Sequence, residues 1–532
     1  MKAKIEMAEF FLELFTEEMP PNLQSAAREN LLINFKIFFD KENIIYGEES
    51  DIKVFSTPNR LVIYFKNINK EISQKAEEIR GPNINAQEVA LEGFIKSNQI
   101  DKKSIYVKKT EKGDFYFFKK PSIKIKTIDK LNDQIPKILG KIPWKKSMKW
   151  GEFNLQWGRP LKSILAVFNN KSLSFKYHHL ESSNFTIIDK NFEDKTKTFN
   201  NFKLYFDYFK KTQIILNQNQ RKKFIEKKLL KISSRKNLLI EINDKLLDEV
   251  TNLVNNPNII SCKFDEKFLK IPKEVLITTM QFHQKYFHTF DKKGNITNNF
   301  LVVANNKDNK GFIKAGNERV INARLSDAQF FWEKNKSNNL IKQVLKLKSI
   351  NYFKGMGTYF DKVQRMRRLG GMFSDEFLIS KDKVEISTTI CKVDLLSDIV
   401  REFPELQGII GGYFAEFQGF DKDISLAVRE HYLPIGADSK IPKKPFSIAL
   451  ALTDKIDTLV GFFGIDQKPT SSKDPFALRR SSLGVIRLLL ENDKELKLKD
   501  LINYSYNLYL EQGFKLSNKT IYKDLNNFFV ER

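Results

Sequence analysis

The sequence predicts a multi-domain α+β protein in which a mixed α/β region precedes a mainly helical one. Two observations lead to this prediction. A chain of 532 residues is longer than one hydrophobic core usually organises. After Gln329 strand signals become rare, and apolar residues recur at i, i+3 and i+4. We therefore expect an N-terminal α+β region at 1–335, made of several subdomains, a helical domain at 336–490 and a helical tail at 491–532.

The N-terminal region alternates strand-like and helix-like segments. FFLELF (10–15) is an apolar run that ends before a Pro-rich turn, and residues 23–39 repeat apolar side chains at helical spacing. DIKVFSTPNRLVIYF (51–65) is rich in β-branched and aromatic residues, which is typical of two strands that meet around Pro58. Further strand-like segments are predicted at 103–125, 161–180, 201–216 and 300–304.

Two helices are predicted in the second half of the chain. VEISTTICKVDLLSDIVREF (384–403) has one apolar face, and its acidic residues, among them Asp394, recur every four residues. FSIALALTDKIDTLVGFF (446–463) is more apolar and contains Asp454. Acidic residues on two helices that are expected to be buried suggest a metal site, so Asp394 and Asp454 are candidate metal ligands.

The stretch KPTSSKDPFALRR (468–480) resembles a phosphate-binding loop only superficially. A P-loop needs a glycine directly before its lysine and a Ser or Thr after it, and both are missing here. Asp474 is a good N-cap and Pro475 suits the first helical position, so the stretch predicts a helix start. A helix N-terminus also favours anions, so a phosphate contact of nucleic acid stays open for the nearby basic residues. These are Lys473, Arg479 and Arg480.

Composition indicates a reducing compartment and a polyanionic partner. The formal net charge is +25, and RNA is the obvious candidate for such a basic chain. The two cysteines have no CxxC spacing, so neither a disulfide framework nor a thiolate zinc site is expected. The N-terminus MKAKIEMAEFFLELF contains glutamates where a signal peptide would stay apolar, and no long apolar run follows. We expect a cytoplasmic protein with no membrane partner.

The helical half resembles the HD superfamily of metal-dependent phosphohydrolases. Asp394 in KVDLL matches the Asp of its His-Asp pair, and Asp454 in LTDKID matches its later Asp. Val393 stands where the histidine of the pair belongs, and VQRMRRLGG (363–371), where the first histidine should lie, contains none. Valine binds no metal, so we expect a degenerate HD-like domain with two structural carboxylates, no metal and no catalytic residue. An active hydrolase is the less favoured alternative.

A series of longer motifs resembles one family over most of the chain, the β subunit of the bacterial two-subunit (α2β2) glycyl-tRNA synthetase. No single motif is decisive, but their order is specific. The motifs are FFLELFTEEMPP (10–21), STPNRL (56–61), RGP (80–82), KSMKWGEFNLQWGRPL (146–161), MQFHQKYF (280–287), GNERVINARLSDAQFFWEKN (316–335), REFPELQGIIGGYFA (401–415), VREHYLP (428–434) and LTDKIDTLVGFFGIDQKPTSSKDPFALRRSSLGVIR (452–487).

The resemblance implies a ligase subunit that binds tRNA(Gly) and does not itself form glycyl-adenylate. The implied partner is a catalytic α subunit, which would use ATP and Mg²⁺, so no cofactor is expected on this chain. The N-terminal region would be partly like the β subunit of phenylalanyl-tRNA synthetase. A stand-alone RNA-binding scaffold is the remaining alternative.

The resemblance also marks residues expected to contact tRNA. Basic side chains near helix starts suit phosphate oxygens. The expected tRNA-binding residues are Lys473, Arg479, Arg480, Arg365, Arg367 and Arg368. The final stretch, SNKTIYKDLNNFFVER (517–532), predicts an amphipathic helix. Family members continue from a similar segment into an anticodon-binding domain, so we expect a naturally shortened chain or a fragment.

Overall fold

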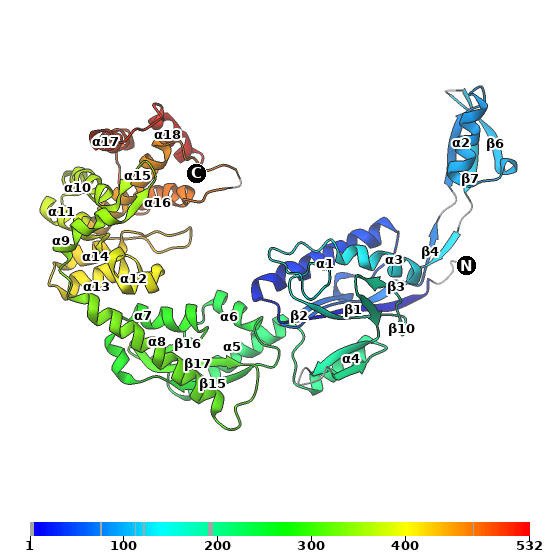
Figure 1. The fold of residues 1–532 in the computed structure, drawn as a ribbon, viewed down its shortest axis with the longest axis horizontal. Helices are drawn as coiled ribbons and strands as arrows, with labels where there is room; N and C mark the ends of the chain where they lie inside the picture. Colours follow the sequence, from blue (N-terminus) through cyan, green and yellow to red (C-terminus); the bar gives the residue numbers. More distant parts are fainter. Residues whose placement is uncertain (1–4, 75–76, 112, 121–122, 190–194, 472) are drawn as a thin grey trace. The chain divides into compact units, whose positions relative to one another are not determined.

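The computed structural model describes residues 5–74, 77–111, 113–120, 123–189, 195–471 and 473–532. Its contacts divide the chain into two compact units (Figure 1). Unit 1 contains residues 1–261 and 301–313, and unit 2 contains 262–300 and 314–532. Strands and sheets dominate unit 1 and helices dominate the later part of unit 2, so the predicted α+β class is confirmed.

Unit 1 is built on a seven-stranded sheet whose central strand is β1 (Met7–Thr16). β1 pairs antiparallel with β3 (Arg60–Asn69) and with β9 (Leu161–Phe168). The predicted hairpin around Pro58 is present, since β3 also pairs with β2 (Ile52–Thr57). The remaining strands of this sheet are β10 (Lys171–Ser172), β11 (Lys176–Tyr177) and β12 (Leu180–Ser183).

Both faces of this sheet are covered, because successive side chains of β1 point to opposite sides. Phe10, Leu12 and Leu14 pack against α1 (Pro21–Lys41) and α3 (Thr127–Leu139). Phe11 packs on the other face against α4 (Phe202–Lys211). Figure 1 shows α4 on the side of the sheet opposite to α1 and α3. One strand therefore contributes to two separate cores.

The strand predicted over 201–216 is wrong, because α4 occupies most of that segment. Its buried aromatic residues, Phe202, Tyr205 and Phe209, follow helical spacing and face one core. The side chain of Asn201 accepts a hydrogen bond from the Leu204 N–H and caps the helix.

Several smaller elements complete unit 1. A two-stranded ribbon leads to a small sheet, of order β5-β7-β6, that is associated with a helix. Two helices, α5 and α6, follow α4 along the chain. The bounds are β4 (Glu71–Gln74), β5 (Glu77–Asn83), α2 (Glu88–Asn98), β6 (Ile105–Thr110), β7 (Gly113–Lys120), β8 (Ile123–Lys126), β13 (Phe185–Asp189), β14 (Lys195–Thr198), α5 (Gln218–Arg235) and α6 (Asp244–Thr251).

Unit 2 is mainly helical. The chain crosses between the units within β15 (Asn258–Lys263), β17 (Ile296–Ala304) and α8 (Phe312–Lys336). The other elements are α7 (Lys273–Thr278), β16 (Phe287–Phe290), α9 (Leu340–Gln343), β18 (Asn351–Phe353), β19 (Gly357–Thr358), α10 (Tyr359–Glu376), α11 (Lys381–Ile390), α12 (Asp398–Glu402), α13 (Ile409–Phe417), α14 (Lys422–Glu430), α15 (Pro445–Gly464), α16 (Leu478–Leu490), α17 (Leu498–Glu511) and α18 (Ile521–Val530).

The centre of unit 2 is α15, which confirms the helix predicted over 446–463. It is buried along almost its whole length and contacts α10, α14, α16, α17 and α18. The core around α15 also includes Leu501, Ile502 and Leu525 from α17 and α18. The tail at 491–532 therefore shares this core, while the domain boundaries at 335 and 490 stay predictions.

The single helix predicted over 384–403 is wrong. The chain forms α11, then a short 3₁₀ helix at Val393–Leu396, then α12. The break occurs where Asp394 turns inward to bind backbone N–H groups of another segment, and Ser397 caps the next helix by accepting from the Val400 N–H. A tertiary contact of Asp394 and a local cap by Ser397 thus interrupt an apolar pattern that is otherwise helical.

Candidate functional site

A group of buried ion pairs lies in unit 2 where α10 packs against α15. Arg365 Nε donates to Asp457 Oδ1 at 2.7 Å, and Lys362 Nζ donates to Asp457 Oδ2 at 3.1 Å. The Tyr509 hydroxyl adds a third donor at 3.3 Å. Burial opposes ionisation of Asp457, but the positive charges of Arg365 and Lys362 hold its pKa below the usual range. The carboxylate of Asp457 is therefore buried, and the two cations neutralise its negative charge.

Asp454, one helical turn earlier, binds two ammonium groups. Lys362 Nζ lies 3.0 Å from Oδ1, and Lys392 Nζ lies 3.0 Å from Oδ2. Burial alone would raise the pKa of Asp454, but these lysines lower it well below its usual range. Lys392 also bonds His431 Nε2 at 2.9 Å, while His431 Nδ1 bonds the Val428 carbonyl at 2.6 Å. Nε2 is therefore the acceptor of a neutral imidazole.

Asp394 does not share these partners. Its Oδ2 accepts hydrogen bonds from the Gly408 N–H at 2.5 Å and from the Gly411 N–H at 3.2 Å. Burial raises the pKa of Asp394 to about 6. Among the residues that the structure describes, no group of three or more His, Cys, Asp or Glu side chains has the arrangement of a metal site. The contacts support structural roles for Asp394 and Asp454, which stay predictions.

A pocket of about 480 Å³ opens beside Asp454. Its walls come from β18, α10, α15, the start of α16, the 3₁₀ helix Pro404–Leu406 with the residue after it, and the segments that follow α11 and α14. Four basic side chains and two acidic side chains line it, together with three tyrosines. The charged residues are Lys362, Lys392, Lys455, Arg480, Glu405 and Asp454, and the tyrosines are Tyr352, Tyr359 and Tyr432.

The sequence singled out only Asp454 and Arg480 from this pocket. The lysines were missed because no motif assigns chemistry to a lysine beside an aspartate. A signal was present, since KVD places Lys392 two residues before Asp394, and TDKID places Lys455 directly after Asp454.

The loop at 468–480 forms a helix start that differs from the predicted one. The prediction that Asp474 is the N-cap is wrong, because the N-cap of α16 is Ala477. Asp474 still accepts hydrogen bonds from the N–H groups of Leu478 and Arg479, both at 2.9 Å, from three residues before the cap. The prediction that Pro475 occupies the first helical position is wrong, because α16 begins at Leu478. Ala477 has a φ of 55°, in the left-handed region, and connects the turn to the helix.

One predicted tRNA contact needs correction. Arg365 is only 1% exposed and is held by Asp457, Gln512 Oε1 at 2.7 Å and the ring of Tyr509. Its guanidinium therefore presents no surface to a phosphate group, and we remove it from the expected interface. The spacing could not reveal this, because Arg365 and Arg368 are three residues apart on roughly the same side of α10, yet the first is buried by other helices and the second is exposed.

The other predicted basic residues lie at the surface of unit 2. Arg367 and Arg368 are exposed and pair with Glu385 and Glu511. The remaining three, Lys473, Arg479 and Arg480, lie beside the turn that starts α16: Lys473 and Arg480 are exposed, and half-buried Arg479 donates to the Thr470 carbonyl. As tRNA contacts, these five residues stay predictions.

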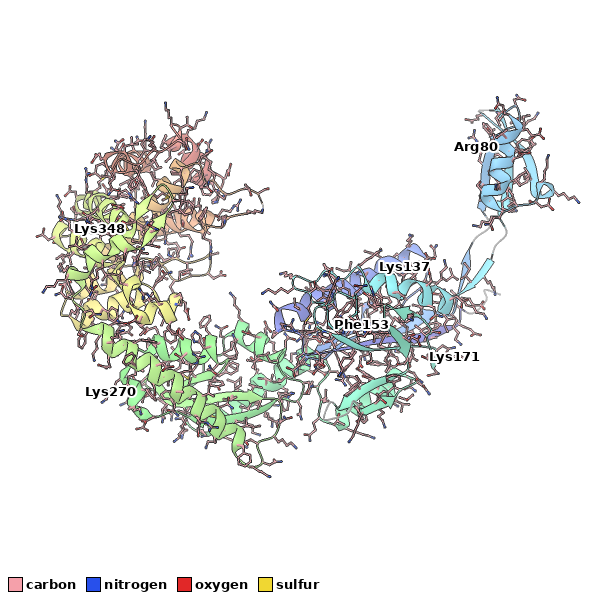
Figure 2. The ribbon with its side chains drawn as sticks, in the orientation of Figure 1. Arg80, Lys137, Phe153, Lys171, Lys270 and Lys348 are labelled. Carbon is pink, nitrogen blue, oxygen red and sulfur yellow. The ribbon has the colours of Figure 1, made fainter. Side chains whose placement is uncertain are left out.

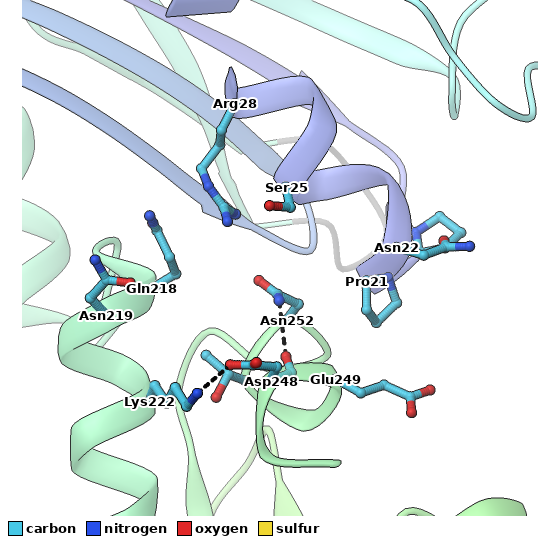
Figure 3. A pocket seen from close by; sticks show the side chains of 12 residues that line it. Pro21, Asn22, Ser25, Arg28, Gln218, Asn219, Lys222, Asp248, Glu249 and Asn252 are labelled. Carbon is cyan, nitrogen blue, oxygen red and sulfur yellow. Dashed lines mark hydrogen bonds and ion pairs between the residues drawn. The ribbon is translucent and has the colours of Figure 1, made fainter. Parts of the chain in front are cut away.

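Unit 1 has a larger pocket, of about 710 Å³, between α1, α5 and α6 (Figure 3). Figure 3 shows Arg28 from α1 and Lys222 from α5 on different walls. Lys222 Nζ pairs with Asp248 Oδ1 at 2.6 Å, and Arg28 donates to the Ser56 hydroxyl. Positive and negative groups are mixed and already paired, so the pocket indicates no particular ligand. No motif in the sequence pointed to it.

Exposed basic side chains occur on both units. Figure 2 labels Lys137 and Lys171 in unit 1 and Lys270 and Lys348 in unit 2, and all four are exposed. None of the helices in the described part of the chain combines the length and the apolar character that crossing a membrane requires.

Comparisons with known proteins give the class to which this chain belongs. Three similar proteins are all subunits of an aminoacyl-tRNA synthetase. The chain is 36% identical over 527 residues to the glycine–tRNA ligase beta subunits of Rickettsia peacockii (strain Rustic) and Rickettsia conorii (strain ATCC VR-613 / Malish 7). It is 35% identical over 529 residues to that of Rickettsia prowazekii (strain Madrid E). Each similarity covers 99% of this chain and 77% of the relative.

A family model points to the particular protein. The model described as glycyl-tRNA synthetase beta subunit matches residues 10–532. The chain therefore belongs to the glycyl-tRNA synthetase beta subunit family.

Proposed function

We propose that this chain binds tRNA(Gly) and assembles with a catalytic α subunit into an α2β2 glycyl-tRNA synthetase in the cytoplasm. The observation that carries the proposal is the family match, which extends over residues 10–532. The formal charge of +25 adds support, because tRNA is a polyanion whose phosphates attract Lys and Arg.

In this proposal the α subunit forms glycyl-adenylate with ATP and Mg²⁺, and this chain binds no cofactor of its own. Its contribution is to hold tRNA and to complete the assembly. The basic residues at the surface beside the start of α16 and on α10 are the candidate phosphate contacts. They are Lys473, Arg479, Arg480, Arg367 and Arg368.

Glycylation assays with purified components test the proposal. We expect no glycyl-tRNA from this chain alone with ATP, glycine and tRNA(Gly), and efficient charging when a cognate α subunit is added. The control is α alone, which should charge poorly because tRNA binding is assigned to this chain. Robust glycylation by this chain alone, or full activity of α without it, would contradict the proposal.

The two alternatives make different predictions. A metal-dependent phosphohydrolase would need ligands around Asp454, but two lysine ammonium groups already contact that carboxylate. A stand-alone RNA-binding scaffold would bind tRNA and leave charging by α unchanged. Size-exclusion chromatography of the mixture, with the glycylation assay, separates the scaffold from the synthetase subunit.

A further inference from the structure

The pocket beside Asp454 has an excess of positive charge. Its four basic and two acidic lining side chains leave two positive charges without acidic partners in the wall. Buried charges are stable only when they are paired or hydrogen-bonded, so such an excess favours an anionic ligand. The excess of two positive charges stays the same when Asp457 is counted, because Asp457 pairs with Arg365 and neither residue lines the pocket.

Lys455 is the clearest uncompensated charge. It is 6% exposed, and its Nζ donates to the Tyr432 carbonyl at 3.0 Å. No carboxylate lies within ion-pair distance of it among the described residues, because neighbouring Asp454 faces the other two lysines. Burial lowers the pKa of Lys455 to about 8, and Asp454 offsets this only in part. This ammonium group lacks a counter-ion.

The packing of α15 against α16 makes room for Lys455. A Cβ added at Gly484 would lie 2.8 Å from Lys455 Cε and 3.1 Å from its Cδ. The glycine therefore leaves a channel through which the lysine stem reaches the pocket. The stem of Lys455 is thus packed between two helices, and its charged end lines the pocket.

The remaining wall offers further donors and aromatic surface. Lys392 lies 3.8 Å from the centre of the Tyr432 ring, which helps to hold it in place. Arg480 is exposed at the pocket, and no hydrogen bond or ion pair of its guanidinium is found in the described part of the chain. Tyr352 and Tyr359 form an edge-to-face pair, with ring centres 5.2 Å apart. Their rings add apolar area beside the charges.

We propose that this pocket binds a nucleoside monophosphate, with the phosphate held by Lys455 and Arg480 and the nucleoside against Tyr352 and Tyr359. A phosphate dianion matches the excess of two positive charges, which a single carboxylate would not. The volume of about 480 Å³ falls in the range of small-molecule sites. Aromatic rings give nucleobases a stacking surface. The proposal does not depend on the glycylation function.

Isothermal titration calorimetry of the full chain tests this proposal. AMP, GMP, CMP and UMP are titrated separately, and adenosine and inorganic phosphate serve as partial ligands. We expect at least one nucleotide to bind at one site per chain, at least tenfold more tightly than adenosine or inorganic phosphate. Lys455→Met and Arg480→Gln should each weaken that nucleotide at least tenfold. Lys270→Met, at an exposed lysine of the same unit, should leave its affinity unchanged.

Three results would overturn the proposal. One is the absence of saturable binding by all four nucleotides. The second is a nucleotide that binds no more tightly than adenosine or inorganic phosphate. The third is unchanged affinity in Arg480→Gln, a variant at an exposed position where loss of folding is not expected. Because the readout is binding by this chain alone, failure here is distinct from failure of glycylation with α.

Discussion

The Arg365 guanidinium and the Asp457 carboxylate form a pair in which both side chains are fully buried, with Nε 2.7 Å from Oδ1. Asp457 also accepts from Lys362 and Tyr509, so the acid connects α10, α15 and α17. Removing one member of such a pair leaves an uncompensated charge in the core, which costs far more than the loss of a surface contact. Arg365 is therefore central to the stability of unit 2.

We expect Arg365→Ala to destabilise unit 2 by about 3–5 kcal/mol, the range for a broken buried ion pair. The matched control is Arg367→Ala, whose side chain is 49% exposed and pairs with Glu385. Its cost should stay below about 1 kcal/mol. Urea denaturation followed by circular dichroism compares the two variants. Similar midpoints for both would contradict the central role of Arg365.

Lys455→Met should stabilise the protein at pH 7. The folded pKa of Lys455 is about 8, against an ordinary value of 10.5, so its charge opposes folding wherever both states are protonated. Removing the charge should raise stability by about 3 kcal/mol. Between pH 8 and 10.5 the folded parent loses the proton while the unfolded chain keeps it, so the parent gains stability and the difference shrinks. Denaturation of both proteins at pH 7 and pH 10 measures the difference in their free energies of unfolding. A difference that grows with pH would contradict the claim that the charge of Lys455 opposes folding.

Ala477→Gly should stabilise the start of α16. Ala477 has a φ of 55°, where glycine is less strained than an L-residue with a Cβ. We expect a gain of up to about 1 kcal/mol. Ala449→Gly, inside α15, is the opposite control and should cost about 1 kcal/mol or more, because glycine disfavours helix interiors. Thermal midpoints of the two variants should therefore shift in opposite directions, and a lower midpoint for Ala477→Gly would argue against strain at this turn.

Binding of tRNA should weaken steeply with salt, since every neutralised phosphate releases counter-ions. The double variant Lys473→Ala/Arg480→Ala should reduce the slope of log K against log salt by about 1 to 2 if both residues contact phosphate. Filter binding at several salt concentrations measures the slope. Lys137→Ala, at an exposed position of α3 in unit 1, is the comparison, because its ammonium already pairs with Asp133. A slope equal to that of the parent would assign Lys473 and Arg480 to other roles.

The sequence predicted the elements whose pattern is local. β1, the hairpin around Pro58 and α15 follow directly from apolar runs and a turn residue. It failed at 201–216, where aromatic residues favour strands until Asn201 caps a helix. It also failed at 384–403, where Asp394 leaves the helical path to bind Gly408 and Gly411, contacts that depend on the tertiary fold.

The candidate site was predicted less completely than the fold. The two aspartates were identified by resemblance, but what surrounds them depends on how helices pack. Arg365 and Arg368 are three residues apart on α10, and one is buried while the other is exposed. The lysines that contact Asp454 come from α10 and from the segment after α11, and no local pattern brings them together.

The division of the chain into units has a consequence for synthesis on the ribosome. Residues 301–313 belong to unit 1, yet 262–300, which belong to unit 2, are translated before them. Domains generally fold as units while the nascent chain emerges, N-terminal parts first. Unit 1 cannot be complete until residue 313 has left the exit tunnel, by which time an unfinished part of unit 2 is already outside. Translation speed between 262 and 313 should therefore influence the yield of correctly folded protein more than speed in the first 200 codons.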